Sequence, residues 1–254
     1  MANYLITGVS SGLGRELTKT LVKQNHHVFG LARRKDLLQS LKTELGKPDH
    51  YDFIDIDIAE ENAWKKIVAA VAKINFTPNV VIFNAAIFEK DYLGKELNYN
   101  QTKNIFEINL FSVIRGFEEL IKIAKPGTQF VFISSSSALK GSGAEGIGYP
   151  SSKAALSIAF ESLYQKYRGR YRLKLIYFGP IHTDMLPFKS RFTPVLSKEQ
   201  AVQKIIRTVS SGRAIVYYPG ILFLFLRIIK LLPDFIYLTI LNQIDILHIK
   251  SSKE

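Results

Sequence analysis

Thr7-Gly8-Val9-Ser10-Ser11-Gly12-Leu13-Gly14 follows a short apolar run at residues 4–6 and precedes a helical pattern of apolar residues. A strand, a glycine-rich turn and a helix in this order are the context of a dinucleotide-binding fingerprint. Gly8 allows the tight turn, Gly12 lets backbone N–H groups approach a pyrophosphate, and Gly14 permits close packing of the helix. The octapeptide therefore predicts a phosphate site at the positive end of a helix.

Short apolar segments alternate with helical stretches along the rest of the chain. We expect strands near residues 3–7, 27–32, 51–56, 79–84, 129–134, 172–178 and 214–217. This alternation predicts an α/β fold with a doubly wound parallel sheet of about seven strands. In such a fold, ligands bind at the carboxyl ends of the strands.

Tyr149 and Lys153 stand four residues apart, which places both side chains on one face of a helix. A phenol with an ordinary pKa of about 10 is a poor acid or base at neutral pH. A fixed ammonium group nearby favours the phenolate and lowers that pKa. Together with the glycine-rich turn, the pair indicates acid/base chemistry beside a bound nucleotide.

In these motifs the chain resembles the short-chain dehydrogenase/reductase family, over about residues 3–184. Its glycine turn has the spacing G-x-x-x-G-x-G, and Tyr149 with Lys153 matches Y-x-x-x-K. The resemblance implies a three-layer Rossmann fold and an NAD(P)-dependent oxidoreductase acting on CH–OH and C=O groups. It also implies a homodimer or homotetramer, paired through helices at about 102–122 and 149–168.

Two further segments depart slightly from the family pattern. Asn84-Ala85-Ala86 stands where the family has Asn-Asn-Ala-Gly, with Phe83 and Ala86 replacing the first Asn and the Gly. Phe178 replaces the leading Pro of the Pro-Gly-x-x-x-Thr segment that ends at Thr183. These substitutions favour an alternative, a non-catalytic NADP(H)-binding regulatory or scaffold protein of the same fold.

The catalytic set that the resemblance implies is Asn109, Ser135, Tyr149 and Lys153. Tyr149 donates the proton, Ser135 orients the carbonyl oxygen, Lys153 lowers the tyrosine pKa and holds the ribose, and Asn109 links Lys153 to solvent through a water. Counting from the strand at 130–133 makes Ser135 the catalytic serine, whereas counting back from Tyr149 gives Ser136. We prefer Ser135, because a strand end is geometrically fixed and a loop absorbs an extra residue.

The cofactor-binding set implied by the resemblance is Gly8, Ser10, Ser11, Gly12, Leu13, Gly14, Arg33, Asp57, Ile58, Asn84, Tyr149, Lys153, Gly179, Ile181 and Thr183. After the second strand, Ala32-Arg33-Arg34 carries no acid for a ribose 2′-hydroxyl, so Arg33 favours NADP(H) over NAD(H). Arg15 is expected to add a second positive contact. Asp57 with Ile58 is expected to hold the adenine, and Asp55 is the rival for that carboxylate.

The wider composition limits the function classes. The five histidines show no ligand spacing, so we expect no metal. The absence of cysteine and a nucleotide motif that starts near residue 3 favour a cytoplasmic location without a signal peptide. The net charge of +12 comes from scattered basic residues without a nucleic-acid motif, so we expect no nucleic acid and consider an anionic membrane surface instead.

We divide the chain into a catalytic NAD(P)-binding domain at 1–219 and a hydrophobic extension at 220–254. Apart from a stripe with Arg227, Lys230 and Asp234, the extension is apolar around most of its circumference, so it must be covered. Its apolar runs are shorter than the roughly 20 residues that span a bilayer, and Pro233 divides it in two. We favour peripheral attachment to the cytosolic face of a membrane, with a lid over the cleft or a subunit interface as alternatives.

The substrate cleft is expected between residues 88–100, 140–148 and 185–196. Met185, Leu186, Phe188 and Phe192 suggest an apolar wall. The substrate should therefore be a small hydrophobic carbonyl compound or alcohol, lipid-like or aromatic, although one fold hosts many specificities.

Overall fold

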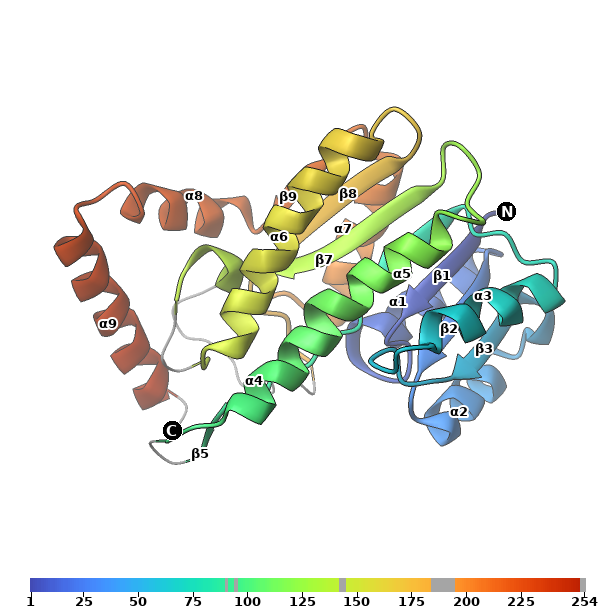
Figure 1. The fold of residues 1–254 in the computed structure, drawn as a ribbon, viewed down its shortest axis with the longest axis horizontal. Helices are drawn as coiled ribbons and strands as arrows, with labels where there is room; N and C mark the ends of the chain where they lie inside the picture. Colours follow the sequence, from blue (N-terminus) through green and yellow to red (C-terminus); the bar gives the residue numbers. More distant parts are fainter. Residues whose placement is uncertain (90, 94–95, 142–144, 184–194, 252–254) are drawn as a thin grey trace.

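A seven-stranded parallel sheet lies at the centre of the computed structural model (Figure 1), which describes residues 1–89, 91–93, 96–141, 145–183 and 195–251. The strand order is β3-β2-β1-β4-β7-β8-β9, and each neighbouring pair is parallel. The strands are β1 (Asn3–Thr7), β2 (His27–Ala32), β3 (Tyr51–Asp55), β4 (Val80–Phe83), β7 (Gln129–Ser135), β8 (Arg172–Phe178) and β9 (Ile215–Tyr218).

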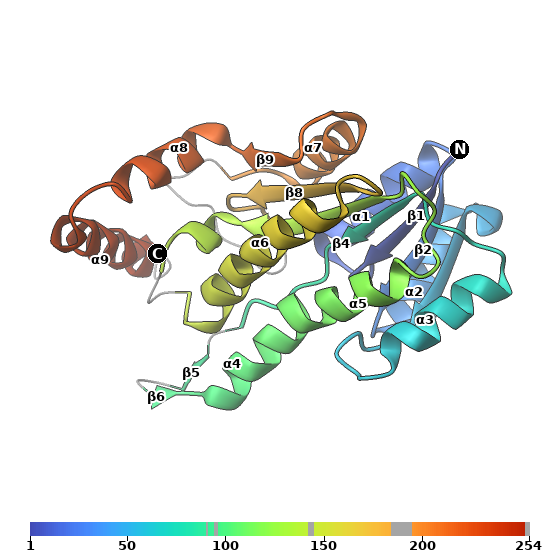
Figure 2. The same ribbon diagram turned by 45° about the horizontal axis from the view of Figure 1, so that its top comes forward.

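Helices cover both faces of this sheet (Figure 2). The helices are α1 (Gly12–Lys23), α2 (Lys35–Leu45), α3 (Ala63–Lys73), α4 (Tyr99–Phe106), α5 (Ser112–Leu120), α6 (Gly148–Tyr167), α7 (Lys198–Ser210), α8 (Gly220–Ile229) and α9 (Asp234–Ser251). One hydrophobic core packs α1, α2 and α7 on one face, and a second packs α3, α5 and α6 on the other. Three short helical segments complete the chain: η1 (Pro48–His50), η2 (Glu107–Phe111) and η3 (Ser136–Leu139).

The fold class predicted from the sequence is confirmed, and each of the seven strands lies within one residue of its expected bounds. The apolar runs of the five inner strands are buried on both faces, as in a covered parallel sheet, whereas the edge strands β3 and β9 are only partly buried. The hairpin of β5 (Tyr92–Leu93) and β6 (Glu96–Leu97) was not predicted. Strands of two residues are too short to show a period in the sequence.

The carboxyl ends of the strands bring the expected site residues to one edge of the sheet. Each follows or ends a different strand: the glycine turn after β1, Arg33 after β2, Asp57 after β3, Asn84 after β4, Ser135 at the end of β7 and Gly179 after β8. This edge is where ligands bind in doubly wound folds.

The C-terminal helices α8 and α9 extend away from the three layers (Figures 1 and 2). Pro233 lies between them, as the sequence predicted. Phe223, Leu226 and Ile229 of α8 are buried, and the Phe223 ring packs at 5.8 Å from Tyr177 of β8. Within the described residues, no helix is both long enough and apolar enough to cross a bilayer.

Candidate active site

The glycine turn after β1 is closed by its own backbone and by the end of β4. Gly8 adopts a φ of +77°, and a Cβ atom on Gly14 would lie 2.2 Å from the Gly8 carbonyl oxygen. The Thr7 hydroxyl accepts hydrogen bonds from the backbone N–H groups of Asn84 (3.0 Å) and Ala85 (2.9 Å). The Asn84 side chain donates to the Thr7 carbonyl at 3.0 Å. The Asn84 amide therefore stabilises the turn. Its contribution to cofactor binding would be to hold the turn in place.

The N-terminus of α1 offers free donors for a phosphate. Ser11 is the N-cap, its side chain makes no capping bond, and the first turn carries no acidic residue. Gly12 has a φ of +55°, and the nearest atom to a Cβ there would be in the Thr183 side chain, 3.9 Å away. A Cβ on Gly12 would thus be in ordinary van der Waals contact with Thr183, which places Thr183 beside the start of α1. Leu13 packs against the core beside it.

Two arginines follow β2 and face different partners. Arg33 is largely exposed and reaches Asp57 Oδ2 at 3.5 Å, while Asp57 Oδ1 accepts from the Ala59 N–H. Arg34 donates to the Ser10 hydroxyl at 2.9 Å and to the Ser11 hydroxyl at 2.6 Å. Positive charge therefore lies on both sides of the strand end, at Asp57 and at the glycine turn.

Two basic residues differ from the expectation. Arg15 does not face the nucleotide turn, because it is paired with Glu44 at 2.7 Å and donates to the Leu37 carbonyl. Arg34, which is not among the site residues predicted from the sequence, lies over the turn instead. In the sequence, only its position next to Arg33 points to Arg34 as a site residue. The folded structure shows that the Arg34 guanidinium, and not that of Arg33, faces the Ser10 and Ser11 hydroxyls.

Ile58 has a buried side chain that belongs to the main core, which leaves its backbone for contact with a ligand. The rival carboxylate, Asp55, faces Lys35 at 4.0 Å. Asp57 is thus the carboxylate that shares its surroundings with Arg33.

Ser135, Tyr149 and Lys153 are brought together between β7 and α6. The Ser135 hydroxyl donates to the Ser137 hydroxyl at 3.1 Å and accepts from the Ser137 N–H at 3.2 Å, and it lies close enough to Tyr149 to lower the pKa of that phenol. Lys153 Nζ donates to the Ile133 carbonyl at 2.9 Å and lies 5.9 Å from the centre of the Tyr149 ring. Ser136 begins η3, and within the described residues its side chain makes no hydrogen bond. The contact with Tyr149 thus involves the serine that was counted from the strand.

Burial has the largest effect on the pKa values of Tyr149 and Lys153. It raises the pKa of Tyr149 to about 12, against the hydrogen bond from Ser135, which lowers it. Burial also lowers the pKa of Lys153 to about 8. The expected lowering of the tyrosine pKa by Lys153 is not seen in this state, because the ammonium group points to the Ile133 carbonyl.

Asn109 lies in η2, a single π-helical turn between α4 and α5, and such turns are frequent at functional sites. Its side chain is buried, accepting from the Ile87 N–H at 2.9 Å and donating to the Ile87 carbonyl and to the Ser152 hydroxyl, both at 3.1 Å. Both amide hydrogens are thus used. A water at this position would have to bind the remaining lone pair or the backbone.

The residues that follow β8 contact different parts of the molecule. A Cβ on Gly179 would lie 3.0 Å from Leu222 of α8, so this glycine faces the C-terminal helix. Ile181 forms an isolated bridge with Leu196, and Thr183 faces Gly12. The expected apolar wall, Met185, Leu186, Phe188 and Phe192, lies outside the described residues.

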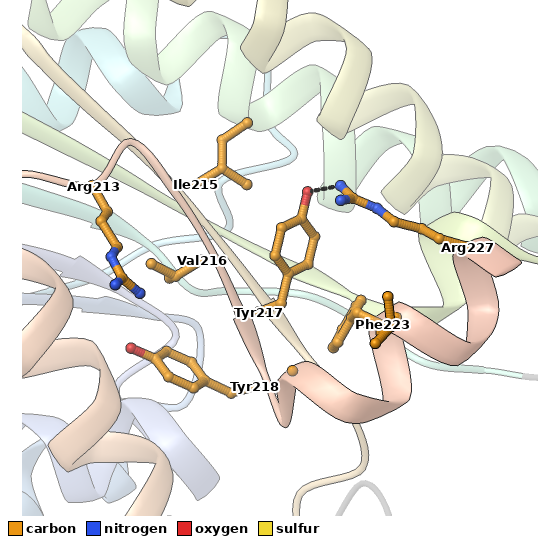
Figure 3. A pocket seen from close by; sticks show the side chains of 9 residues that line it. Arg213, Ile215, Val216, Tyr217, Tyr218, Phe223 and Arg227 are labelled. Atoms are coloured by element: carbon orange, nitrogen blue, oxygen red, sulfur yellow. Dashed lines mark hydrogen bonds between the residues drawn. The ribbon is translucent and has the colours of Figure 1, made fainter.

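A cavity of about 310 Å³ lies away from these side chains, between β9 and α8 (Figure 3). Tyr217 points toward Arg227, whose guanidinium stacks 4.6 Å from the ring, and Arg213 and Tyr218 lie on the other side of β9. In the described part of the chain, no three His, Asp or Glu side chains gather closely enough to hold a metal ion.

Comparison with known proteins identifies the family. The model of the short chain dehydrogenase family matches residues 2–193, and the chain belongs to this family. It is an NAD(P)-dependent oxidoreductase.

Three relatives illustrate the similarity. An NADPH-dependent pterin aldehyde reductase of Arabidopsis thaliana is 26% identical over 183 residues, 72% of this chain and 76% of the relative. A benzil reductase of Saccharomyces cerevisiae, described as (S)-benzoin forming, is 27% identical over 191 residues, 71% and 72% of the two chains. A short-chain dehydrogenase/reductase structure from Brucella melitensis shares the fold, with a TM-score of 0.76, 18% identity and coverage of 85% and 95%.

Proposed function

We propose that the chain is an NADPH-dependent reductase that transfers hydride between NADP(H) and the carbonyl or alcohol group of a hydrophobic substrate. The observation that carries this proposal is the cluster of Ser135, Tyr149 and Lys153 at the carboxyl end of β7, beside a glycine turn with free N–H donors. A non-catalytic nucleotide-binding protein would not need an acid, an orienting hydroxyl and a buried ammonium group in one place.

Each side chain has a separate task in this reaction. The bound nicotinamide would supply the hydride that reduces the carbonyl carbon. Tyr149 donates its phenolic proton to the oxygen that becomes the alcohol, and solvent returns a proton to the phenolate. Ser135 donates a hydrogen bond to the same oxygen, and Lys153 stabilises the phenolate by its charge and holds the cofactor ribose. In the reverse direction, the Tyr149 phenolate accepts the proton.

The remaining proposed roles follow the geometry of the site. Phosphate would lie against the N-terminus of α1, adenine beside Asp57 and Ile58, and the nicotinamide end near Asn84 and the segment after β8. Asn109, which is hydrogen-bonded to Ser152 of α6, would support the movement of protons between Lys153 and solvent. The cofactor-binding residues that we propose are Gly8, Ser10, Ser11, Gly12, Leu13, Gly14, Arg33, Arg34, Asp57, Ile58, Asn84, Tyr149, Lys153, Gly179, Ile181 and Thr183.

The preference for NADP(H) rests on Arg33 and Arg34. A ribose 2′-phosphate is a dianion that guanidinium groups bind through charge-assisted hydrogen bonds. Asp57, the carboxylate nearest this strand end, is already neutralised by Arg33 at 3.5 Å. The NADPH dependence in the name of the Arabidopsis relative supports this assignment.

An apolar substrate is supported by the surroundings of Tyr149. The Phe88 ring packs edge-on against the Tyr149 ring at 4.9 Å, and Ile147 is half exposed at the start of α6. Benzil, in the name of the yeast relative, is an aromatic diketone of this kind.

We further propose that residues 1–219 form the catalytic domain and that the extension at 220–254 attaches it peripherally to an anionic membrane. The outer face of α8 carries four exposed apolar side chains at helical spacing: Ile221, Leu224, Phe225 and Ile228. The inner face of the same helix is buried on the domain, so the outer stripe is rigidly presented. Exposed Arg227 and Lys230 lie beside it and would attract anionic head groups.

A homodimer or homotetramer is proposed through the helices at about 102–122 (α4, η2 and α5) and 149–168 (α6). Along the first of these helices, Ile105, Ile108 and Val113 are buried in the protomer and belong to its core. Phe111, Ile114 and Ile158 remain exposed and are the side chains available to a second copy.

Replacing Tyr149 by Phe tests the reaction, because it removes only the proton donor. We expect kcat for NADPH-dependent reduction of benzil or of aromatic aldehydes to fall about 10²- to 10⁴-fold, with NADPH affinity nearly unchanged. The control is Tyr164→Phe on the same helix, which should keep normal turnover. Near-normal kcat in Tyr149→Phe would refute the mechanism. Tight NADPH binding without turnover of any carbonyl by the unaltered protein would favour the scaffold alternative.

Replacing Arg33 or Arg34 by Ala tests cofactor preference. Each variant should raise the Kd for NADPH about 10- to 100-fold in a fluorescence titration, through loss of a charge-assisted contact, and leave NADH binding nearly unchanged. Lys66→Ala removes an exposed charge from α3 and should change neither value. If both cofactors lost affinity equally, the arginines would not contact the 2′-phosphate.

Light scattering tests the proposed oligomer. The unaltered protein should be a dimer or tetramer at micromolar concentration, and Phe111→Glu combined with Ile158→Glu should be a monomer. Ile221→Glu, on α8, should leave the mass unchanged. A monomeric unaltered protein contradicts the proposal.

Vesicle co-sedimentation tests the membrane proposal. The full chain should sediment with vesicles containing phosphatidylserine, less so at high salt, and Leu224→Ser with Phe225→Ser and Ile228→Ser should abolish this by removing apolar surface. These substitutions are preferable to truncation at Pro219, which would uncover the core around Phe223. Ile74→Ser, an exposed apolar residue elsewhere, is the control. If the unaltered protein stays in the supernatant at low salt, the extension is a lid or an interface.

A further inference from the structure

Asp91 is a fully buried carboxylate in the segment that follows β4. Its Oδ1 accepts from the Ile147 N–H at 2.9 Å, and its Oδ2 accepts from the Gly148 N–H at 2.6 Å and from the Thr102 hydroxyl at 2.8 Å. Burial alone would raise the pKa of Asp91, but these three hydrogen bonds, together with one from its own backbone, outweigh it and hold the pKa below its usual value. The carboxylate is thus buried as an anion with its acceptors used.

The two backbone N–H groups that Asp91 binds belong to the start of α6, the helix of Tyr149 and Lys153. This helix has no cap of its own, because Ile147 is the N-cap residue and the first turn carries no acid. Pro150 has no N–H, which removes one unsatisfied donor from the first turn. Asp91, which lies 57 positions before Gly148 in the chain, therefore caps the N-terminus of α6, as an Asp or Ser at the N-cap position does in other helices.

The chain at the start of α6 has glycine at the two positions that the Asp91 carboxylate approaches most closely. Gly146 adopts a φ of +85°, and a Cβ atom there would lie 2.1 Å from Asp91 Oδ1. A Cβ on Gly148 would lie 3.1 Å from Asp91 Oδ2. Glycine at these two positions is what allows the carboxylate to reach the helix terminus.

The segment that carries Asp91 also touches Tyr149 directly. Asn109 holds the backbone of Ile87 by both its N–H and its carbonyl, and the next residue, Phe88, packs edge-on against the Tyr149 ring. Asp91 closes this segment onto α6 and, through Thr102, onto α4. The position of the phenol is therefore set from two sides, by Phe88 on the ring and by Asp91 on the backbone one residue before it.

We propose that Asp91 is a positioning residue for the reaction, one that acts through the first turn of α6 to hold the Tyr149 hydroxyl against Ser135. This inference rests on the proposed role of Tyr149 as the proton donor. It assigns Asp91 no contact with substrate or cofactor. Its signature is a loss of kcat without a matching loss of cofactor affinity.

The test compares Asp91→Asn with Ser197→Ala in the full chain. Asn keeps the shape of Asp but replaces an acceptor oxygen with an N–H₂ group that faces an N–H donor. Ser197 caps α7 by a reciprocal pair of bonds with Gln200, so Ser197→Ala removes a helix cap far from Tyr149. Both variants should unfold at lower temperature. Only Asp91→Asn should lower kcat, about tenfold, on the carbonyl probe with the highest kcat/KM, with the Kd for NADPH within about twofold, since misplacement by a fraction of an ångström has this effect.

Hydrogen exchange gives a second readout that needs no substrate. Peptides covering the first turn of α6 should exchange faster in Asp91→Asn than in the unaltered protein, and unchanged in Ser197→Ala. If Asp91→Asn does not fold, Thr102→Val replaces it, because this change removes one donor to the carboxylate and keeps the helix bonds. It should lower kcat about threefold.

Tyr149→Phe, measured in parallel, separates the two proposals. If Tyr149→Phe loses turnover while Asp91→Asn (or Thr102→Val in its place) keeps normal kcat, the positioning role is wrong and the reaction stands. If the loss of kcat in Asp91→Asn is matched by an equal loss of NADPH affinity, the effect is general loosening of the site and the inference is overturned. If Tyr149→Phe keeps its turnover, the proposed reaction itself fails.

Discussion

The approach of Gly14 to the Gly8 carbonyl is the constraint on which the nucleotide end of this molecule depends. With 2.2 Å between that oxygen and the place of a Cβ atom, no other residue fits at position 14 without moving the turn away from α1. The turn is then fixed to the centre of the sheet, because the Thr7 hydroxyl and the Asn84 amide connect the ends of β1 and β4. The close contact therefore fixes the start of α1 against the turn at the carboxyl end of β1.

Features that depend on local sequence could be predicted well. The seven strands were found because a buried parallel strand is a continuous apolar run between helical patterns. The glycine turn and the pair of Tyr149 and Lys153 were found because their spacing alone carries a physical meaning. Ser135 was preferred to Ser136 from the strand end; it lies close enough to lower the pKa of Tyr149, and its catalytic role stays a prediction.

Features that depend on tertiary contacts were missed. Arg15 and Arg34 are both basic residues near the turn, and only the packing of α2 shows that Glu44 takes the first while Ser10 and Ser11 face the second. The contact of Asp91 with α6 could not be predicted from the neighbouring sequence, because its partners Ile147 and Gly148 lie far along the chain. The buried state of Lys153, with its ammonium group on the Ile133 carbonyl, likewise reflects the folded surroundings and not the four-residue spacing.

The two faces of α8 have different neighbours, and this has a consequence for the whole molecule. On its inner side, Phe223 enters the main core and Leu222 packs on Gly179, the residue that follows β8. On its outer side, the apolar stripe faces solvent. One helix therefore contacts both the carboxyl end of β8 and the outer surface. Any ligand that shifts α8 from one side has a coupling free energy with the other side, and linkage requires that coupling to be equal in both directions.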